Sequence, residues 1–200
     1  MANVQGPFGF TQIGTASGPP NFAQGGNPPW RIAAANGTAI FFGDLVKLTT
    51  SSNTGYVIQA TAANSTNPNV GIFYGCQYYS TSQKKTVWNN YWPGSDATGD
   101  VIAYVCDDPA AQFLAQAGAS PIDQTSLGKT VDIVVGTGNT TTGLSAMSLG
   151  SPGTTSTFPF KIVNVVTSPP GVNGTDVTTG YNNVIVAFNF QIYKTGVATP

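Results

Sequence analysis

The side chains that could carry chemistry in this chain are few, and most are carboxylates. The sequence contains eight aspartates but no glutamate and no histidine. Histidine is the most common general acid–base group near neutral pH and the most common metal ligand. Its absence removes Ser-His-Asp and Cys-His nucleophile activation, together with most zinc chemistry. The composition therefore predicts a binding protein with no catalytic site, cofactor or bound metal.

Asp107 and Asp108 are the best candidates for a catalytic pair of carboxylates, and Pro109 follows them directly. Adjacent residues of a strand point to opposite faces, so this pair would not converge on one substrate. Aspartate before proline is also ordinary turn chemistry. We interpret the pair as a turn, with an aspartate-dependent depolymerase as the alternative. Asp96 and Asp100 are interpreted as loop residues, and metal binding there stays open.

A cluster of aromatic side chains is the strongest candidate for a binding surface. Such rings enrich protein interfaces, and stacked rings could also form a platform for a sugar. Packing in the protein core is the third interpretation, and the sequence leaves all three open. The cluster consists of Tyr78, Tyr79, Trp88, Tyr91 and Trp92.

A short segment at Gly128-Lys129-Thr130 is similar to the end of a phosphate-binding loop. That motif requires a glycine five residues before Gly128, where this chain has Asp123, whose carboxylate would repel a phosphate. The segment that follows is strand-like, whereas a phosphate-binding loop leads into a helix. We therefore interpret the segment as a turn that enters a strand.

The overall composition favours association with other surfaces but not with nucleic acid or membrane. Charged residues make up 8% of the chain and its net charge is −1, whereas roughly a quarter of an ordinary domain is charged. Few charges oppose contact, and seven dispersed cations form no stripe that could bind a nucleic-acid backbone. No secretory signal and no apolar run of the ~20 residues that span a bilayer are recognisable. Cys76 and Cys106 are therefore expected to be free thiols in the core.

From Thr38 onward, short runs of β-branched and aromatic residues alternate with turn residues, a pattern typical of sandwiches and barrels. The last run alternates best, because five apolar side chains from Val184 to Ile192 share one face. The segment Ala110–Ala117 has helix propensity but is predicted as a strand. We predict an all-β domain over residues 31–200, either a β-barrel or a β-sandwich. The other strands are expected near residues 38–42, 45–48, 55–60, 70–79, 84–88, 100–106, 129–135, 160–166 and 183–193.

The first thirty residues differ from the rest because glycine and proline interrupt every periodic pattern. We predict that residues 1–30 form an extended N-terminal arm. Four aromatic side chains along it could lie on a neighbouring subunit, or they could pack on the domain's own core, and both interpretations stay open. These side chains are Phe8, Phe10, Phe22 and Trp30.

Several segments, read in order, resemble a family of tailed-bacteriophage virion proteins that decorate the head and are encoded near the major capsid protein. Relative to that family, glutamates after the Asp-Asp-Pro turn are absent, and the N-terminal Gly/Pro region is longer. The resemblance lies in Met1–Val4, Pro7–Phe10, Ile40–Leu48, Val70–Cys76, Val87–Trp88, Tyr91–Gly94, Tyr104–Pro109 with Phe113, Gly136–Ser145, Phe160–Val163 and Pro169–Pro170.

The resemblance implies a non-enzymatic cement protein on the exterior of the virion, made in the host cytoplasm. Its expected partners are the major capsid protein and neighbouring copies of itself, which makes it a homo-oligomer on the capsid. No cofactor, nucleic acid or membrane is implied. The alternative is a carbohydrate-binding β-sandwich of a virion fibre or adsorption apparatus, with Trp88 and Trp92 as its sugar-binding rings.

Overall fold

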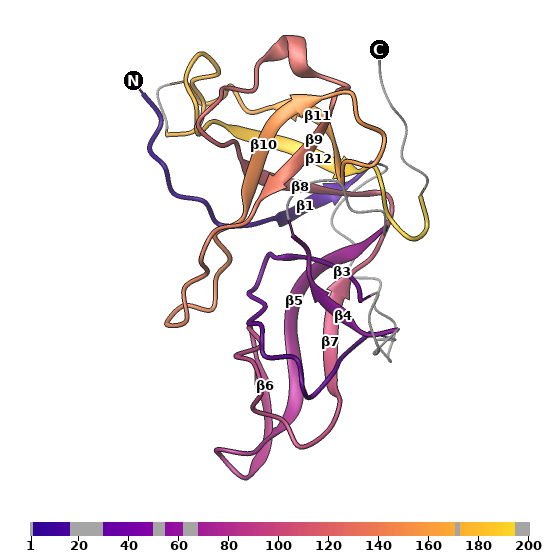
Figure 1. Cartoon of the computed structure of the whole chain (residues 1–200). Helices are drawn as coiled ribbons and strands as arrows, with labels where there is room; N and C mark the ends of the chain where they lie inside the picture. The colour runs from indigo at the N-terminus through magenta and orange to yellow at the C-terminus, as the bar shows by residue number, and fades with distance from the viewer. Residues whose placement is uncertain (1, 17–29, 50–54, 62–67, 171–172, 195–200) are drawn as a thin grey trace.

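The computed structural model describes residues 2–16, 30–49, 55–61, 68–170 and 173–194 of the chain (Figure 1). Two antiparallel β-sheets pack together, and within the described residues the helical structure is one short 3-10 turn, η1 (Gln124–Ser126). The predicted all-β fold is therefore confirmed. Because the strands form two sheets, the architecture is that of a β-sandwich.

Sheet A forms one end of the molecule and contains six strands in the order β1-β8-β12-β11-β9-β10. A bridge between Ala117 and Leu149 joins the end of β8 to β10, so the sheet curls towards closure. Its strands are β1 (Thr11–Thr15), β8 (Ala111–Gln116), β9 (Thr130–Val134), β10 (Ser148–Gly153), β11 (Phe160–Val165) and β12 (Asn183–Phe188).

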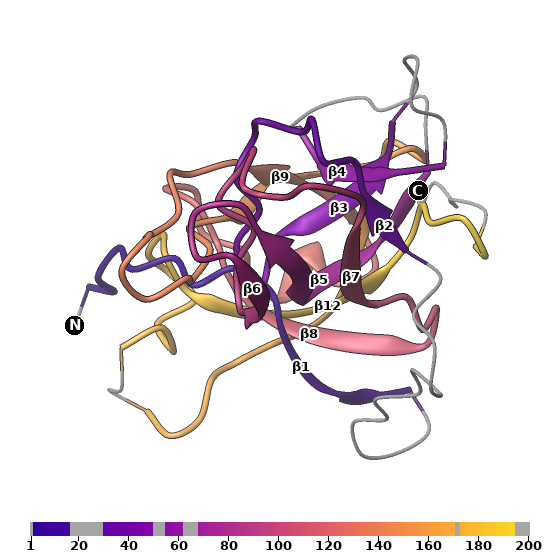
Figure 2. The same cartoon turned by 90° about the horizontal axis from the view of Figure 1, so that it is seen from below.

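Sheet B extends away from sheet A, and Figure 2 shows it from its far end. Its order is β2-β7-β5-β3-β4, with β6 paired to the far half of the long strand β5. The outer strands β2 and β4 contact each other, so this sheet curls as well. Its strands are β2 (Arg31–Ile32), β3 (Leu45–Leu48), β4 (Val57–Gln59), β5 (Asn69–Ser80), β6 (Lys85–Asn89) and β7 (Val101–Cys106).

The best alternating run behaves as expected over its first half. Val184, Val186 and Phe188 are fully buried in β12, whereas the residues between them are partly exposed. The strand then ends at Phe188, five residues before the predicted end. The side chain of Asn189 explains the end, because its amide donates to the carbonyls of Ser156 and Phe158. The neighbouring strand β8 confirms the strand prediction for the segment Ala110–Ala117.

One predicted strand is wrong. The segment from Thr38 to Phe42 forms two isolated bridges, from Ile40 to Trp92 and from Phe42 to Leu144. Consecutive parts of this segment thus pair with different partners, and no continuous ladder forms. Two strands of sheet A, β1 and β10, were not predicted, because their sequences are interrupted by glycine or proline and lack an apolar alternation.

The first hydrophobic cluster occupies the space enclosed by the curl of sheet A and the junction between sheets A and B. Aromatic rings stack at its centre, with ring centroids 4.4 Å apart for Phe10 and Phe160 and 5.6 Å apart for Phe160 and Phe188. Sheet B contributes side chains to this cluster from the end that lies next to sheet A, among them Ile72 on β5 and Cys106 on β7. The two sheets therefore share this cluster only where the near end of sheet B meets sheet A.

The second cluster lies within the curl of sheet B. Trp92 is its largest fully buried side chain, and Tyr78 meets it edge-on with ring centroids 5.1 Å apart. Val101, Ala103 and Val105 of β7 point into this cluster, because alternate residues of a strand share a face. The opposite face of β7 carries Ile102, Tyr104 and Cys106.

The N-terminal segment is not an extended arm in its described part. Residues 11–15 form β1, which pairs with β8. Phe10 is fully buried in the first cluster, so it cannot be an anchor on a neighbouring subunit. Phe8 is half-buried. Trp30 packs against the second cluster and donates its indole N–H to Asp107 at 3.0 Å. Phe22 lies outside the described residues.

Both cysteines are free and buried, as predicted. Burial raises the pKa of the Cys76 thiol to about 12 and that of the Cys106 thiol to about 11. A thiol must lose its proton to act as a nucleophile or a metal ligand. Both side chains therefore serve as small apolar packing groups at neutral pH.

Candidate functional site

The predicted aromatic cluster divides between the interior and the surface. Tyr78 and Trp92 belong to the core, and the indole N–H of Trp92 donates to the backbone carbonyl of Asn36 at 3.0 Å. Both assignments to an interface are therefore wrong, and Trp92 cannot serve in a sugar platform either. Tyr91 is half-buried and stacks on Phe41, with ring centroids 5.5 Å apart.

The other two members of the cluster lie on the surface. Tyr79 on β5 is 49% exposed, and Trp88 on β6 is 62% exposed. The register places Gln77 opposite Trp88 and Tyr79 opposite Thr86. Directly opposed residues point to the same side of a sheet, so both rings lie on one face of the hairpin.

A glycine shapes the surface beneath Trp88. A Cβ on Gly75 would lie 2.9 Å from Cζ2 of the indole, so the ring approaches the strand more closely than any side chain there would permit. Gly75 also has a φ of +141°, a conformation that residues with a Cβ rarely adopt. Gly75 therefore helps to set the position of the indole over the sheet.

Neighbouring strands extend the same face. Tyr104 is opposite Gly75, Ile102 is opposite Gln77, and Arg31 is opposite Ile102. The Tyr104 hydroxyl donates to the side-chain oxygen of Gln77 at 3.2 Å, which holds both groups against the sheet. We call this surface the aromatic face. Its members are Arg31, Gln77, Tyr79, Trp88, Ile102 and Tyr104.

The aromatic face continues the surface through which sheet B packs on sheet A. Cys106 lies on the same side of β7 as Tyr104 and Ile102, and it is buried in the cluster shared by the two sheets. Farther along the strand, sheet B extends past sheet A (Figure 1). Exposure on this side of sheet B increases with distance from sheet A. Cys106 is buried, Tyr104 and Ile102 are half-buried, and Tyr79 and Trp88 are exposed.

The carboxylate of Asp96 holds the turn region of the β5–β6 hairpin. It accepts hydrogen bonds from the hydroxyls of Ser80 at 2.7 Å and Thr81 at 2.8 Å, and from the backbone N–H of Ser82 at 3.0 Å. These donors stabilise the ionised form and lower the pKa of Asp96 to about 2. Asp100 accepts from the Tyr56 hydroxyl.

The aspartates considered for catalysis or metal binding have local partners. Asp107 accepts from Trp30, and Asp108 accepts from the backbone N–H of Ala110 at 2.8 Å, which confirms the turn prediction. Asp123 accepts from Thr125 next to η1. Within the described part of the chain, no group of three or more potential metal-ligating side chains gathers.

Asp44 is the carboxylate that the sequence reasoning missed. It is 1% exposed and accepts from the backbone N–H of Phe41 at 2.8 Å, the Gln59 amide at 2.7 Å and the Ser145 hydroxyl at 2.5 Å. Burial raises its pKa, and the three hydrogen bonds oppose that shift. The Gly43-Asp44 step between two apolar runs was the signal, because a polar residue between such runs is readily enclosed.

Comparisons with family models, curated proteins and solved structures find no match for this chain. Among the described residues, no helix is both long enough and apolar enough to cross a membrane.

Proposed function

We propose that this protein is a non-enzymatic virion protein that decorates and stabilises a phage capsid. In this proposal the aromatic face binds the outer surface of the major capsid protein lattice, and neighbouring copies of the protein lie next to one another there. The order of segments that resembles head decoration proteins supports the choice of partner, and the aromatic face supports the mode of binding.

The observation that carries the proposal is the uncovered continuation of the inter-sheet surface. Its near end is covered by sheet A, whereas Tyr79 and Trp88 at its far end remain exposed. Exposed aromatic rings on a rigid sheet bind at low cost in conformational entropy, and Trp and Tyr are enriched at binding hot spots. A second protein surface would complete the covering that sheet A begins.

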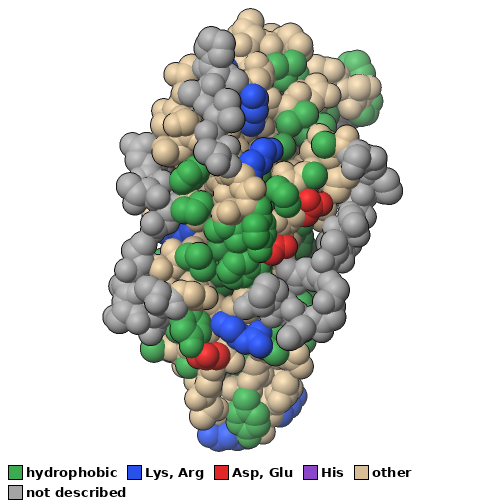
Figure 3. All heavy atoms as spheres, turned by 90° about the vertical axis from the view of Figure 1, so that its right-hand side faces the viewer, with side chains coloured by type: hydrophobic (Ala, Val, Ile, Leu, Met, Phe, Trp, Pro, Cys, Tyr) green, Lys and Arg blue, Asp and Glu red, His purple; other side chains and the backbone are tan. Residues whose placement is uncertain are grey.

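The charge distribution supports association. Figure 3 shows one side of the molecule, on which charged side chains are scattered and hydrophobic side chains gather near mid-height. Lys84 and Lys85 lie beside the aromatic face at the end of the hairpin. Lysines at an edge strand oppose uncontrolled strand-to-strand aggregation. The hairpin is therefore suited to contact through its face and not through its edge.

One contact through the aromatic face binds with modest strength, and many such contacts on a lattice bind more strongly. A whole aromatic side chain presents ~150–250 Å², so the exposed halves of two rings together present about the same area. Covering that area contributes a gross ~4–6 kcal/mol at ~25 cal/mol/Å². Association entropy offsets much of that gain. Contacts with neighbouring copies on a lattice raise the effective concentration of each site, and they convert weak contacts into lasting attachment.

A binding assay on shells tests the proposal. Empty shells of the major capsid protein are incubated with purified protein, and bound copies are counted after sedimentation. Tyr79→Ala combined with Trp88→Ala should weaken binding at least tenfold, because ~1.4 kcal/mol corresponds to tenfold in affinity. Tyr193→Ala is the matched control, since Tyr193 is 61% exposed but lies outside the aromatic face. Unchanged binding of the double variant would refute the proposed contact.

A further inference from the structure

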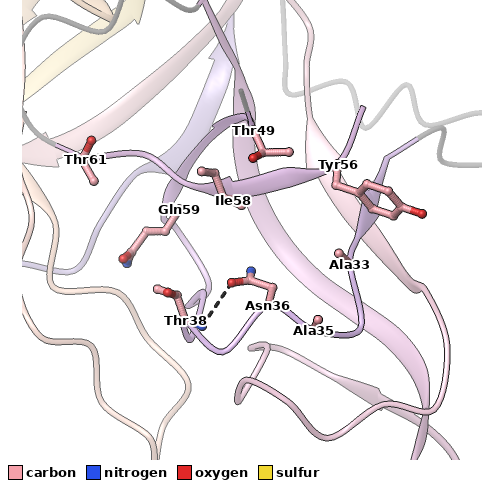
Figure 4. Close-up of a pocket in the computed structure, with 9 residues that line it drawn as sticks. All are labelled: Ala33, Ala35, Asn36, Thr38, Thr49, Tyr56, Ile58, Gln59 and Thr61. Atoms are coloured by element: carbon pink, nitrogen blue, oxygen red, sulfur yellow. Dashed lines mark hydrogen bonds between the residues drawn. The ribbon is translucent and has the colours of Figure 1, made fainter. Parts of the chain in front are cut away.

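A pocket of about 340 Å³ lies where the two outer strands of sheet B approach each other (Figure 4). One wall is β4 with its flanking residues, and the other is the loop that follows β2. The described residues of the lining contribute amides, hydroxyls, one aromatic ring and apolar groups, and none of them carries a charge. The lining residues are Ala33, Ala35, Asn36, Thr38, Thr49, Tyr56, Ile58, Gln59 and Thr61.

The side chain of Asn36 presents a hydrogen-bond donor without a protein partner. Its Oδ1 accepts from the backbone N–H of Thr38 at 3.1 Å, which fixes the orientation of the carboxamide. Its Nδ2 is buried and has no hydrogen-bond partner. Figure 4 shows this nitrogen pointing across the pocket towards β4. Buried polar groups are almost always paired in folded proteins, so this donor points to an acceptor that enters the pocket.

Two further polar side chains are fixed by aspartates outside the lining. The Tyr56 hydroxyl donates to Asp100 at 2.6 Å, which restrains the ring at the side of the pocket. The Gln59 amide nitrogen donates to the buried Asp44 at 2.7 Å, and its carboxamide oxygen is left as an acceptor. The pocket therefore offers a donor, an acceptor and an aromatic surface in defined places.

The loop that carries Asn36 is held in place from behind. The backbone carbonyl of Asn36 accepts from the Trp92 indole at 3.0 Å and from the Ser95 N–H at 3.2 Å. A Cβ on Gly94 would lie 2.6 Å from the carbonyl oxygen of Gly37, so the two loops are in close contact. Because this wall is preorganised, a ligand would not have to order it on binding.

We propose that this pocket binds a neutral sugar, a mono- or disaccharide or the end of a glycan. Sugars match the lining because their hydroxyls both donate and accept, and their apolar ring faces lie well against an aromatic side chain. Among the lining residues that the structure describes, an anion would find no cation and a cation would find no carboxylate. The volume lies at the low end for ligand pockets and limits the ligand to a small one. The inference is independent of the proposed capsid contact, which uses other residues.

A titration with defined sugars tests this inference. The probes are glucose, galactose, mannose and N-acetylglucosamine with their common disaccharides, and amide and side-chain resonances are followed by NMR. At least one sugar should give saturable shifts at Asn36 and Tyr56 at about 10 mM, tenfold above a dissociation constant of about 1 mM. Absence of saturable shifts with every sugar of the panel would overturn the inference.

Two variants locate the site. Asn36→Asp keeps the oxygen that accepts from Thr38 but loses the amide donor, and it should weaken binding at least tenfold. Tyr56→Ala removes the ring and should have a similar effect, whereas Tyr56→Phe, which keeps the ring, should retain part of the affinity. Trp88→Ala is the control and should bind sugar normally. Binding that survives Asn36→Asp but is lost in Trp88→Ala would place the sugar on the aromatic face and contradict the pocket.

Discussion

Asp44 connects parts of the chain that are distant in sequence. Its carboxylate receives hydrogen bonds from the turn before β3, from Gln59 on β4 and from Ser145 in the segment that leads to β10. Through Gln59 it also fixes one wall of the sugar pocket. A buried carboxylate is costly unless hydrogen bonds compensate for the loss of water, and here they do so from three elements.

Removal of this carboxylate should be among the most damaging changes outside the apolar core. Asp44→Ala leaves two buried donors without their acceptor, the backbone N–H of Phe41 and the Ser145 hydroxyl. It should lower the free energy of unfolding by about 2–5 kcal/mol. Asp44→Asn keeps one acceptor oxygen and should lower it less. Urea denaturation measures both effects, and equal losses would show that shape rather than hydrogen bonding matters at this position.

Asp44 should also make the stability of the protein depend on pH. Burial raises the pKa of Asp44 in the folded protein, so the folded state holds this proton more tightly than the unfolded chain does. Its contribution is greatest below the unfolded pKa and declines as the pH rises through the folded pKa. The stability of the wild type relative to Asp44→Asn should therefore decrease in urea titrations as the pH rises above the ordinary aspartate pKa of 3.8. A difference that is constant or increases with pH would contradict this origin.

Gly75 should be intolerant of even one added methyl group. Gly75→Ala places a Cβ 2.9 Å from the Trp88 indole at a φ of +141°, so the indole must shift or the strand must bend. We expect a loss of about 1–3 kcal/mol and a changed Trp88 fluorescence. The matched control is Gly99→Ala, which has open space around it, and it should stay within about 0.5 kcal/mol of the wild type.

At the residue scale, the sequence predicts that aromatic residues form the exposed binding surface, but it does not predict which of the aromatic residues are exposed. Tyr78 and Tyr79 are adjacent and chemically identical, yet one is core and the other is exposed, because alternation along β5 separates them. Choosing between them requires knowing which face of β5 lies within the curl of sheet B. That information comes from strand pairing, which periodicity alone does not supply.

At the scale of elements, the β5–β6 hairpin is held at its turn by one ionised side chain. The hydroxyl and amide donors around Asp96 lower its pKa to about 2, so its contribution is present above the ordinary aspartate pKa and is lost as the pH falls towards 2. In an NMR titration, the Ser82 amide resonance should shift with a midpoint of about 2. Asp96→Asn should abolish that transition, and a midpoint near the ordinary value of 3.8 would contradict the assigned hydrogen bonds.

The N-terminal segment is part of the folded domain in its described residues. Phe10 is fully buried against Phe160, so Phe10→Ala should lower the free energy of unfolding by about 3–5 kcal/mol. Phe8→Ala is the comparison, and it should cost less because Phe8 is half-buried. Chemical denaturation measures both. If Phe10→Ala were fully stable but detached from shells, the arm hypothesis would be restored for this residue.

The strands that could be predicted share a physical property. β7, β8 and β12 alternate between buried and partly exposed residues, and β-branched and aromatic side chains supply that alternation in β7 and β12. By contrast, β10 contains one large apolar residue, Leu149, among glycine, serine and proline, so no periodicity marks it. It exists because β9 and the end of β8 offer hydrogen-bonding partners on both sides. Such tertiary pairing overrides local propensity and cannot be deduced from the segment alone.

For the whole molecule, the incomplete overlap of the two sheets is the feature with the clearest functional meaning. One end of sheet B is covered by sheet A and the other carries exposed rings on the same face. All-β class and low charge could be predicted from composition and pattern, because they are sums over many residues. The overlap of the two sheets could not be predicted from the sequence. It depends on how far the long strand β5 extends beyond the strands that pair with it.

The central claim is that this protein coats a capsid in many copies. Mass spectrometry of purified virus particles, calibrated with labelled peptides of this chain and of the major capsid protein, tests that claim most directly. A copy number comparable to that of the shell subunit is the predicted result. A few copies per particle would place the protein in the tail or fibres, and complete absence from particles would contradict the virion role altogether.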